Sequence, residues 1–189
     1  MPYNGYSDYF EKDVIISVAT TGMGQGKEAN PNLPEQPEEI VEDVIACRQA
    51  GASIVHLHAR DENGDPTMDP ARYQELRDLI HEHVDDIIVN FTTGGRDITD
   101  DRVRPLLETE PHPEVGTIDL GPMNLGADVT VSNTRGQNVD FARKFQERGI
   151  KPELEVFNNG QIPEFEYLVE QGLLEAPYWA TVVLGMQTG

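Results

Sequence analysis

Short runs of apolar and β-branched residues recur along the chain, and segments with helical spacing separate most of them. The runs are Val14–Thr20, Ser53–His58, Ile87–Thr92, Gly116–Leu120, Pro152–Phe157 and Trp179–Leu184. Because these runs are almost continuously apolar, we expect strands that are covered on both faces, as in a parallel sheet. The pattern therefore predicts six strands.

Helical patterns with start and stop signals lie between most of these strands. Pro37 and Gly51 flank a helix over Glu38–Gln49, and Asp69-Pro70 provides the cap and first residue of a second helix. Further helices are expected near Thr99–Leu107, near Val139–Arg148 and after Pro163, the last of them ending at Gly172. This alternation predicts an α/β protein with about six strands and five helices.

Two architectures fit the alternation, an open doubly wound sheet and a TIM (β/α)8 barrel, and periodicity alone does not separate them. A complete barrel usually needs about 250 residues, whereas this chain has 189. The barrel interpretation therefore predicts a single domain, an incomplete TIM barrel over residues 13–189, after a polar extension over residues 1–12. The remaining strands of the barrel are then expected outside this chain.

The chain is strongly acidic, with 34 acidic and 14 basic residues and a formal net charge of −20. Such a charge opposes binding to nucleic acid and to anionic membranes. The acidic residues are spread along the whole chain, which favours a surface adapted to high salt over that of an ordinary acidic enzyme. Without an 18-residue apolar run or an apolar signal segment, a cytoplasmic protein is expected.

The most informative chemical motif is His56-Leu57-His58, at the end of the second predicted strand. Residues i and i+2 of a strand point to the same face, so both imidazoles leave the strand side by side. Parallel α/β folds place their sites at this end of the strands, and two histidines with one carboxylate form a catalytic zinc site. The motif predicts a metal site; one packed and one solvent-facing histidine is the alternative.

Polar residues accompany three other strands. Thr92-Thr93-Gly94-Gly95 follows the third strand, either as an anion-binding turn rich in backbone N–H donors or as an ordinary strand-to-helix turn. Thr117-Ile118-Asp119 and Glu153-Leu154-Glu155 each place two polar side chains on one strand face. A carboxylate inside a barrel is costly unless it is paired or catalytic, so a structural ion pair with an interior arginine is the alternative to a catalytic role.

Taken in order, several motifs resemble those of the β-keto acid cleavage enzyme family, best known for 3-keto-5-aminohexanoate cleavage enzyme. They are Thr21-Gly22, Pro31-Asn32-Leu33-Pro34, Ala50-Gly51-Ala52, His56-Leu57-His58-Ala59-Arg60, Thr93-Gly94-Gly95, Pro152-Glu153-Leu154-Glu155-Val156 and Val183-Leu184-Gly185. The resemblance extends from Asp13 onward. It implies a TIM barrel, usually a homotetramer, in which a β-keto acid reacts with acetyl-CoA to give acetoacetate and a new CoA thioester.

The resemblance also implies roles for individual residues. His56 and His58 would hold zinc, which polarises the keto oxygen as a Lewis acid. Thr92, Gly94 and Gly95 of the glycine turn would hold the substrate carboxylate. Thr117 and Glu155 match polar positions near the reacting groups and are expected to be catalytic, while Asp119 and Arg60 are expected to bind substrate.

The chain departs from the family pattern at three points. The third zinc ligand, a glutamate on a late strand, is expected beyond residue 189 together with a supporting arginine and aspartate, so this chain alone is expected to be inactive or nearly so. Gly24 stands where members that recognise a substrate amine carry glutamate, which disfavours an amino-substituted keto acid. Asp119 stands where the archetype carries an amide.

Two other functions remain open from the sequence. One is a different metal-dependent barrel enzyme such as an amidohydrolase, although those enzymes carry HxH on the first strand and a lysine on the fourth, unlike this chain. The other is a truncated, non-catalytic relic. In either case the apolar edges of an incomplete barrel favour association, so we expect a homo-oligomer.

Overall fold

The computed structural model describes residues 13–94, 101–125 and 128–185, so the predicted extension over residues 1–12 lies outside the described ranges. Six strands form one sheet, in which each strand is parallel to its neighbours. In sheet order they are β1 (Ser17–Ala19), β2 (Ile54–Leu57), β3 (Ile88–Phe91), β4 (Val115–Asp119), β7 (Lys151–Val156) and β8 (Trp179–Val182). Strand order follows chain order, which is typical of a barrel; a doubly wound sheet reverses its strand order.

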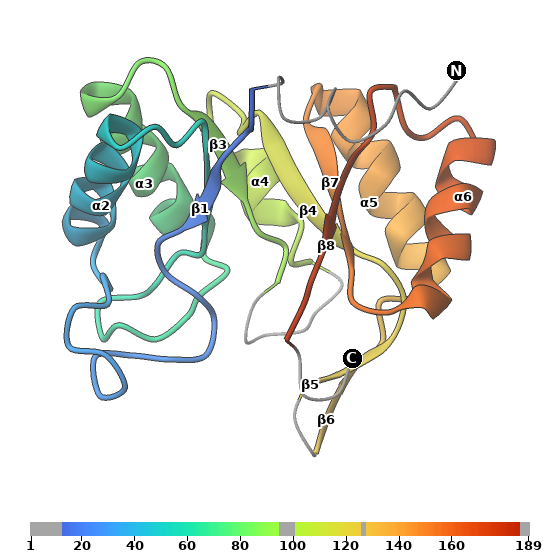
Figure 1. The fold of residues 1–189 in the computed structure, drawn as a ribbon, viewed down its shortest axis with the longest axis horizontal. Coiled ribbons are helices and arrows are strands. Elements are labelled where there is room, and N and C mark those ends of the chain that lie inside the picture. The colour runs from blue at the N-terminus through green and yellow to red at the C-terminus, as the bar shows by residue number, and fades with distance from the viewer. Residues whose placement is uncertain (1–12, 95–100, 126–127, 186–189) are drawn as a thin grey trace.

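The α-helices of the described ranges cover one face of this curved sheet (Figure 1). They are α2 (Pro37–Gln49), α3 (Pro70–His83), α4 (Arg104–Glu108), α5 (Arg135–Arg148) and α6 (Ile162–Glu170), and a 3-10 turn, η1 (Asn159–Gln161), precedes α6. A curved parallel sheet with helices on its outer side is part of a TIM barrel. The structure thus confirms the incomplete barrel with six sheet strands and five helices in the described ranges.

Capping residues set the ends of these helices. The Asp69 side chain accepts a hydrogen bond from the Ala71 N–H at 3.0 Å, as expected for an N-cap. Thr134 and Gln137 form a capping box, so α5 begins at Arg135, earlier than the periodicity predicts. The same helix ends at Gly149, whose φ of 69° is the left-handed conformation that glycine adopts without strain.

The strands alternate between an apolar face and a polar face. On the outer face, side chains that are almost fully buried pack against the helices; they include Val55, Leu57, Val89, Phe91, Ile118 and Leu154. Tyr73 of α3 makes an edge-to-face contact with Phe91, with ring centroids 5.0 Å apart. On the inner face, the strand register pairs His56 with Asn90 and Asp119 with Glu155. Paired residues of parallel strands point to the same side, so these polar groups meet inside the curve.

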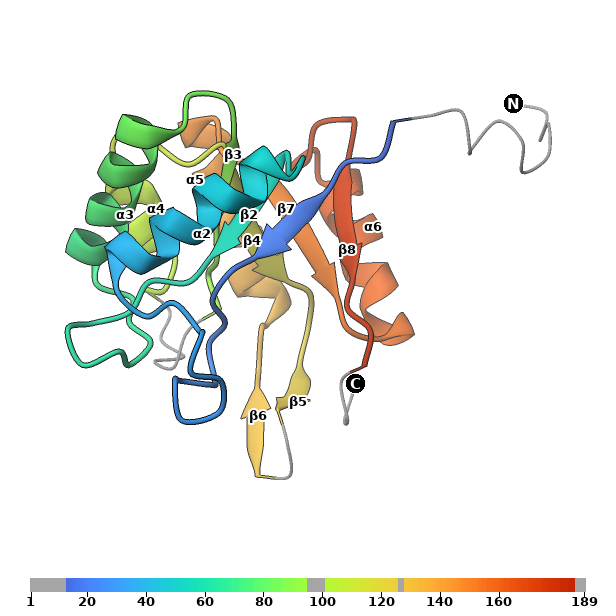
Figure 2. The same ribbon diagram turned by 60° about the vertical axis from the view of Figure 1, so that its left-hand side comes forward.

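A β-hairpin that the periodicity did not predict follows β4. It consists of β5 (Met123–Leu125) and β6 (Val129–Val131), paired antiparallel, and it extends beyond the carboxyl ends of the sheet strands (Figure 2). Three-residue strands are too short to give a recognisable alternation.

Within the described ranges, no helix has the length and apolar character needed to cross a membrane.

Gly116 of β4 lies at a close approach between the sheet and helices α4 and α5. A Cβ at this position would lie 2.7 Å from both Leu106 Cδ2 and Phe145 Cζ, two side chains that are fully buried. We expect Gly116→Ala to lower the free energy of unfolding by about 1–3 kcal/mol through overpacking, measured by urea denaturation. Gly136→Ala in α5 is the control, because its Cβ would meet nothing closer than 3.9 Å; an equal loss in both variants would contradict this explanation.

Candidate active site

A pocket lies at the carboxyl ends of the strands, between the sheet and the β5–β6 hairpin. Its lining residues are Met23, His56, His58, Thr92, Gly94, Arg102, Asp119, Met123, Val131, Glu155, Phe157 and Val183. They come from the ends of β2, β3, β4, β7 and β8 and from neighbouring loops. The fold therefore brings most of the site residues predicted from the sequence into one cavity.

His56 and His58 lie side by side in this pocket, as expected for positions i and i+2 at a strand end. Their Nε2 atoms are 3.3 Å apart, and the two rings are tilted by 57°. Burial, and then the neighbouring His56, lower the pKa of His58 to about 3. The His58 ring is therefore neutral at physiological pH, which is the form that coordinates metal ions.

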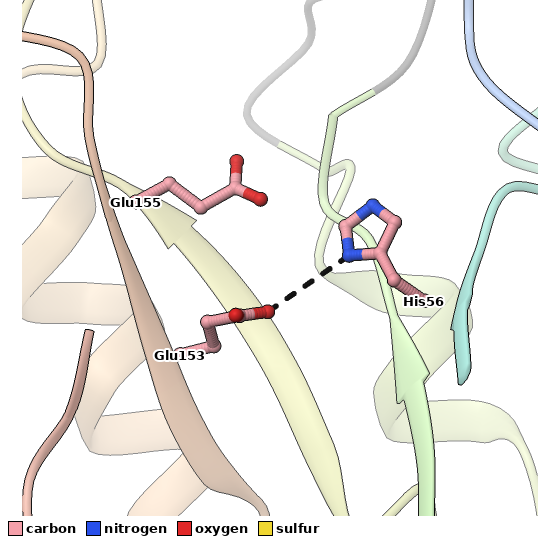
Figure 3. Close-up of side chains that lie close together, drawn as sticks. All are labelled: His56, Glu153 and Glu155. Carbon is pink, nitrogen blue, oxygen red and sulfur yellow. Dashed lines mark ion pairs between the residues drawn. The ribbon is translucent and has the colours of Figure 1, made fainter. Parts of the chain in front are cut away.

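The separation of the two Nε2 atoms suits a shared metal ion. Zinc binds imidazole nitrogen at about 2.0–2.1 Å, so two ligands in tetrahedral geometry lie about 3.3–3.4 Å apart. Carboxylates are also near: ligand atoms of His56, Glu153 and Glu155 all lie within 4.8 Å of one another. Figure 3 shows these three side chains pointing toward a common space. The nitrogen and oxygen donors therefore fit a divalent cation.

Glu153 is buried behind the pocket and accepts several hydrogen bonds. Trp179 Nε1 donates to its Oε1 at 2.9 Å, Thr181 Oγ1 donates to the same atom at 2.5 Å, and Asn90 Nδ2 donates to Oε2. Burial raises the pKa of Glu153, but the neighbouring His56 ring and the hydrogen bonds from Thr181 and Trp179 outweigh this effect and lower the pKa to about 2. Glu153 is consequently an ionised carboxylate at neutral pH.

Glu155 differs from Glu153 in its surroundings, because it lines the pocket beside another carboxyl group. Burial, and then the negative charge of Asp119, raise the pKa of Glu155 well above its ordinary value. Asp119 is itself only 5% exposed, and its Oδ1 has no hydrogen-bond partner within the described residues. A buried carboxyl group with a raised pKa is suited to general acid and base chemistry.

The threonine-glycine turn after β3 is held by β4. The Thr93 N–H donates to Thr117 Oγ1 at 3.0 Å, and Thr93 Oγ1 donates to the Thr117 carbonyl at 2.9 Å. Thr117 is fully buried and does not line the pocket, so it orients the turn. Thr92 and Gly94 do line it, and the Gly94 N–H donates to Thr92 Oγ1 at 2.8 Å. Gly95 lies outside the described residues.

Arg60 is buried in the loop that follows β2 and is absent from the pocket lining. Its guanidinium donates to Thr21 Oγ1 at 3.1 Å and to the carbonyls of Gly22 and Gly64 at 2.7 Å each. These bonds join the loop after β1 to the loop after β2. The contacts favour a structural role for Arg60 over the substrate-binding role expected from the sequence.

Two functional candidates escaped the sequence analysis. Arg102 is buried, lines the pocket and donates to Asn133 Oδ1, yet it stands outside any motif. Asn90 is fully buried at the centre of the polar inner face, next to His56 and Glu153. An amide within the apolar run Ile88–Phe91 was the one signal that pointed to Asn90.

Comparison with known proteins identifies the family of this chain. The family model described as beta-keto acid cleavage enzyme matches residues 13–189. The chain belongs to this family. It is 39% identical to the 3-keto-5-aminohexanoate cleavage enzyme of Fusobacterium nucleatum over 176 residues, which are 92% of this chain and 64% of that protein.

Other members of the family show similar relationships. The chain is 35% identical to the 3-keto-5-aminohexanoate cleavage enzyme of Acetoanaerobium sticklandii, covering 93% of this chain and 64% of that protein. It is 30% identical to the 3-dehydrocarnitine:acetyl-CoA trimethylamine transferase of Rhizobium meliloti, covering 94% of this chain and 66% of that protein. The chain thus spans 64% of the length of these two cleavage enzymes, which is less than two thirds.

Solved structures of ObcA share the fold. The ternary complex of ObcA with a C4-CoA adduct and oxalate superposes with a TM-score of 0.74, covering 84% of this chain and 38% of that one. The apo structure of ObcA gives a TM-score of 0.73. Sequence identities of 23% and 24% limit this likeness to the fold.

Proposed function

We propose that the protein is a zinc-dependent β-keto acid cleavage enzyme. In this reaction a β-keto acid, R-CO-CH2-COO⁻, and acetyl-CoA exchange acyl groups, so that acetoacetate and the thioester R-CO-SCoA form. The observation that carries the proposal is the meeting of His56, His58 and Glu155 in one pocket with the threonine-glycine turn. Family membership supports it, and acetyl-CoA stands in the name of the Rhizobium meliloti relative.

The two histidines would hold the metal ion through their Nε2 atoms. Their 3.3 Å separation matches adjacent zinc ligands, and the depressed pKa of His58 keeps its lone pair available. Zinc supplies a Lewis acid that polarises the keto oxygen of the substrate. The keto carbonyl of the substrate would then be activated at the end of β2, where the two histidines lie.

The turn after β3 would bind the carboxylate of the β-keto acid. Thr92 and Gly94 line the pocket next to the histidines, and Thr117 holds the turn from behind through two hydrogen bonds to Thr93. Arg102 supplies a positive charge at the same pocket, which attracts an anionic substrate.

Glu155 would carry the proton that the acyl exchange requires. It lies on the opposite side of the pocket from the histidines, and its carboxyl group points toward His56 (Figure 3). Asp119 is its neighbour in the register of β4 and β7, and burial and then the charge of Asp119 raise the pKa of Glu155. A group of this kind gives a proton to one reacting atom and recovers it from another.

Association of several chains belongs to the same proposal. Large apolar side chains are exposed on both edge strands and the segments beside them, where Ile15 is 58%, Val182 66% and Leu184 84% exposed. Unpaired, apolar strand edges favour contacts with other polypeptides. This supports a homo-oligomer, consistent with the homotetramer implied by the family resemblance.

The function is tested on the protein with the complete barrel, which includes the strands expected beyond residue 189. The zinc-loaded protein is incubated with acetyl-CoA and a set of β-keto acids, and acetoacetate and CoA thioester are measured. The set includes neutral, acidic and amino-substituted acids, and we expect the neutral or acidic acids to react best because Gly24 offers no carboxylate to an amine. Equal amounts of the two products are expected, lost after chelator treatment and restored by zinc. If the folded, zinc-loaded protein forms no acetoacetate from any acid when the remaining barrel strands are also present, the proposal is wrong.

A further inference from the structure

Glu153 forms the centre of a buried hydrogen-bond network that connects four strands. Its carboxylate, 4% exposed on β7, accepts from Asn90 of β3 on one side and from Trp179 and Thr181 of β8 on the other. On the remaining side, Oε2 lies 3.9 Å from Nδ1 of His56 on β2. The network thus fixes the position of a negative charge next to a candidate metal ligand.

The spacing of His56, Glu153 and Glu155 resembles that of metal ligands, but Glu153 is poorly suited to bind an ion directly. Both of its oxygen atoms already accept hydrogen bonds, and the residue does not line the pocket. Replacing these donors with a metal ion would leave Trp179 Nε1 and Asn90 Nδ2 without their carboxylate acceptor, which is costly for buried groups. Glu153 therefore acts through a neighbour.

That neighbour is His56, whose two ring nitrogens face different surroundings. Nε2 faces His58 Nε2 in the pocket, whereas Nδ1 faces the Glu153 carboxylate on the inner side. An ionised carboxylate only accepts hydrogen bonds, so its charge favours a hydrogen atom on Nδ1. Asn90 Nδ2 donates to Glu153 Oε2 and also lies 3.4 Å from Nδ1 of His56. Its second N–H would favour the opposite tautomer, so the two neighbours of Nδ1 compete.

We propose that Glu153 is a positioning residue that keeps His56 in the Nδ1–H tautomer, so that the Nε2 lone pair faces His58. The effect on metal binding rests on the proposed zinc-dependent function, whereas the tautomer is a property of the metal-free protein. Carboxylates that orient a ligating histidine in this way typically change metal affinity by about 10–100-fold when they are removed. Asn90, Trp179 and Thr181 hold the carboxylate in place.

The tautomer is tested by long-range ¹H–¹⁵N NMR of the imidazole rings in the metal-free protein, with His56 assigned by its absence in His56→Gln. In the wild-type protein we expect His56 as the Nδ1–H tautomer. In Glu153→Gln, whose amide can also donate, we expect the Nε2–H form to gain population. A wild-type His56 that carries its hydrogen on Nε2 overturns the proposal, even if Glu153→Gln does not fold.

Zinc affinity, measured by competition with a chromogenic chelator, gives the second readout. We expect Glu153→Gln to bind zinc about 10–100-fold more weakly and Thr181→Val to show a smaller loss in the same direction. Glu114→Gln is the matched control, because Glu114 accepts from the Val89 N–H at 2.9 Å and pairs with Arg77 but does not face His56. This control should lose stability and keep its zinc affinity.

The outcomes separate this proposal from the proposed function. If the wild-type protein binds no zinc, the metal-dependent function fails, and the tautomer measurement still decides the role of Glu153. If the wild-type protein binds zinc and Glu153→Gln binds it equally well, the positioning role fails while the function stands. Equal weakening in Glu153→Gln and Glu114→Gln also overturns the positioning role, because it reflects a general loss of stability.

Discussion

In a version of the protein with the complete barrel, which we expect to hold about one zinc ion per chain, replacing His56 with alanine is expected to remove nearly all bound zinc. The reason is geometric: the two Nε2 atoms lie 3.3 Å apart, at the spacing of adjacent ligands, and the loss of either leaves a site with too few donors. His58→Ala is expected to have the same effect. Metal analysis after exhaustive dialysis measures both.

The control for these variants is another histidine in the same chain. His83 is exposed at the end of α3, and its Nδ1 lies 2.8 Å from the Leu79 carbonyl, away from the pocket. His83→Ala should therefore retain wild-type zinc. Full zinc occupancy in both His56→Ala and His58→Ala would end the assignment of these residues as ligands.

Glu155→Gln is expected to slow β-keto acid cleavage by about 10²–10⁴-fold, the usual contribution of a general acid or base. The amide keeps the size of the side chain but cannot exchange a proton. Because Glu155 is not assigned as a zinc ligand, bound zinc should stay unchanged. The measurement is kcat with acetyl-CoA and the best β-keto acid, beside metal analysis of the same preparation.

Stability separates this catalytic role from a structural one. Burial and the charge of Asp119 raise the pKa of Glu155, so its ionised form is disfavoured in the folded protein. The stability associated with the protonated form is lost as pH rises through the folded pKa. Glutamine removes that loss, so the variant should be at least as stable as the wild type at high pH.

An exposed carboxylate on α6 provides the matched control for activity. Glu166 lies outside the pocket lining, and Glu166→Gln should leave kcat unchanged. A variant Glu155→Gln with wild-type kcat would contradict the proton-carrying role. A variant that loses activity together with its folded structure at every pH would show that Glu155 is needed for packing.

Local signals in the sequence accounted for much of the fold. Asp69-Pro70 gives the start of α3 as expected, and all the apolar runs became strands. Among these, β2, β3, β4 and β7 contribute buried side chains to the core under the helices. The hairpin β5–β6 was missed because its strands are three residues long. The start of α5 was placed too late because Thr134 and Gln137 cap a polar turn without apolar periodicity.

The sequence by itself determined which side chains share a face. Positions i and i+2 of a strand always point the same way, so His56 and His58, and likewise Glu153 and Glu155, had to leave their strands together. The adjacency of the two histidines was therefore predictable from one short motif. The resemblance to the family added the predicted reaction of that motif, zinc-dependent cleavage of a β-keto acid, which the spacing of the residues alone does not provide.

Only the tertiary structure decided what each of these side chains meets. Glu153 and Glu155 share a strand face, yet one accepts three hydrogen bonds from β3 and β8 and the other adjoins Asp119, so their pKa values move in opposite directions. Arg60 likewise bonds to loop carbonyls, whereas Arg102 reaches the pocket. Such contacts join residues far apart in the chain, and they depend on strand register and sheet curvature, which local periodicity does not encode.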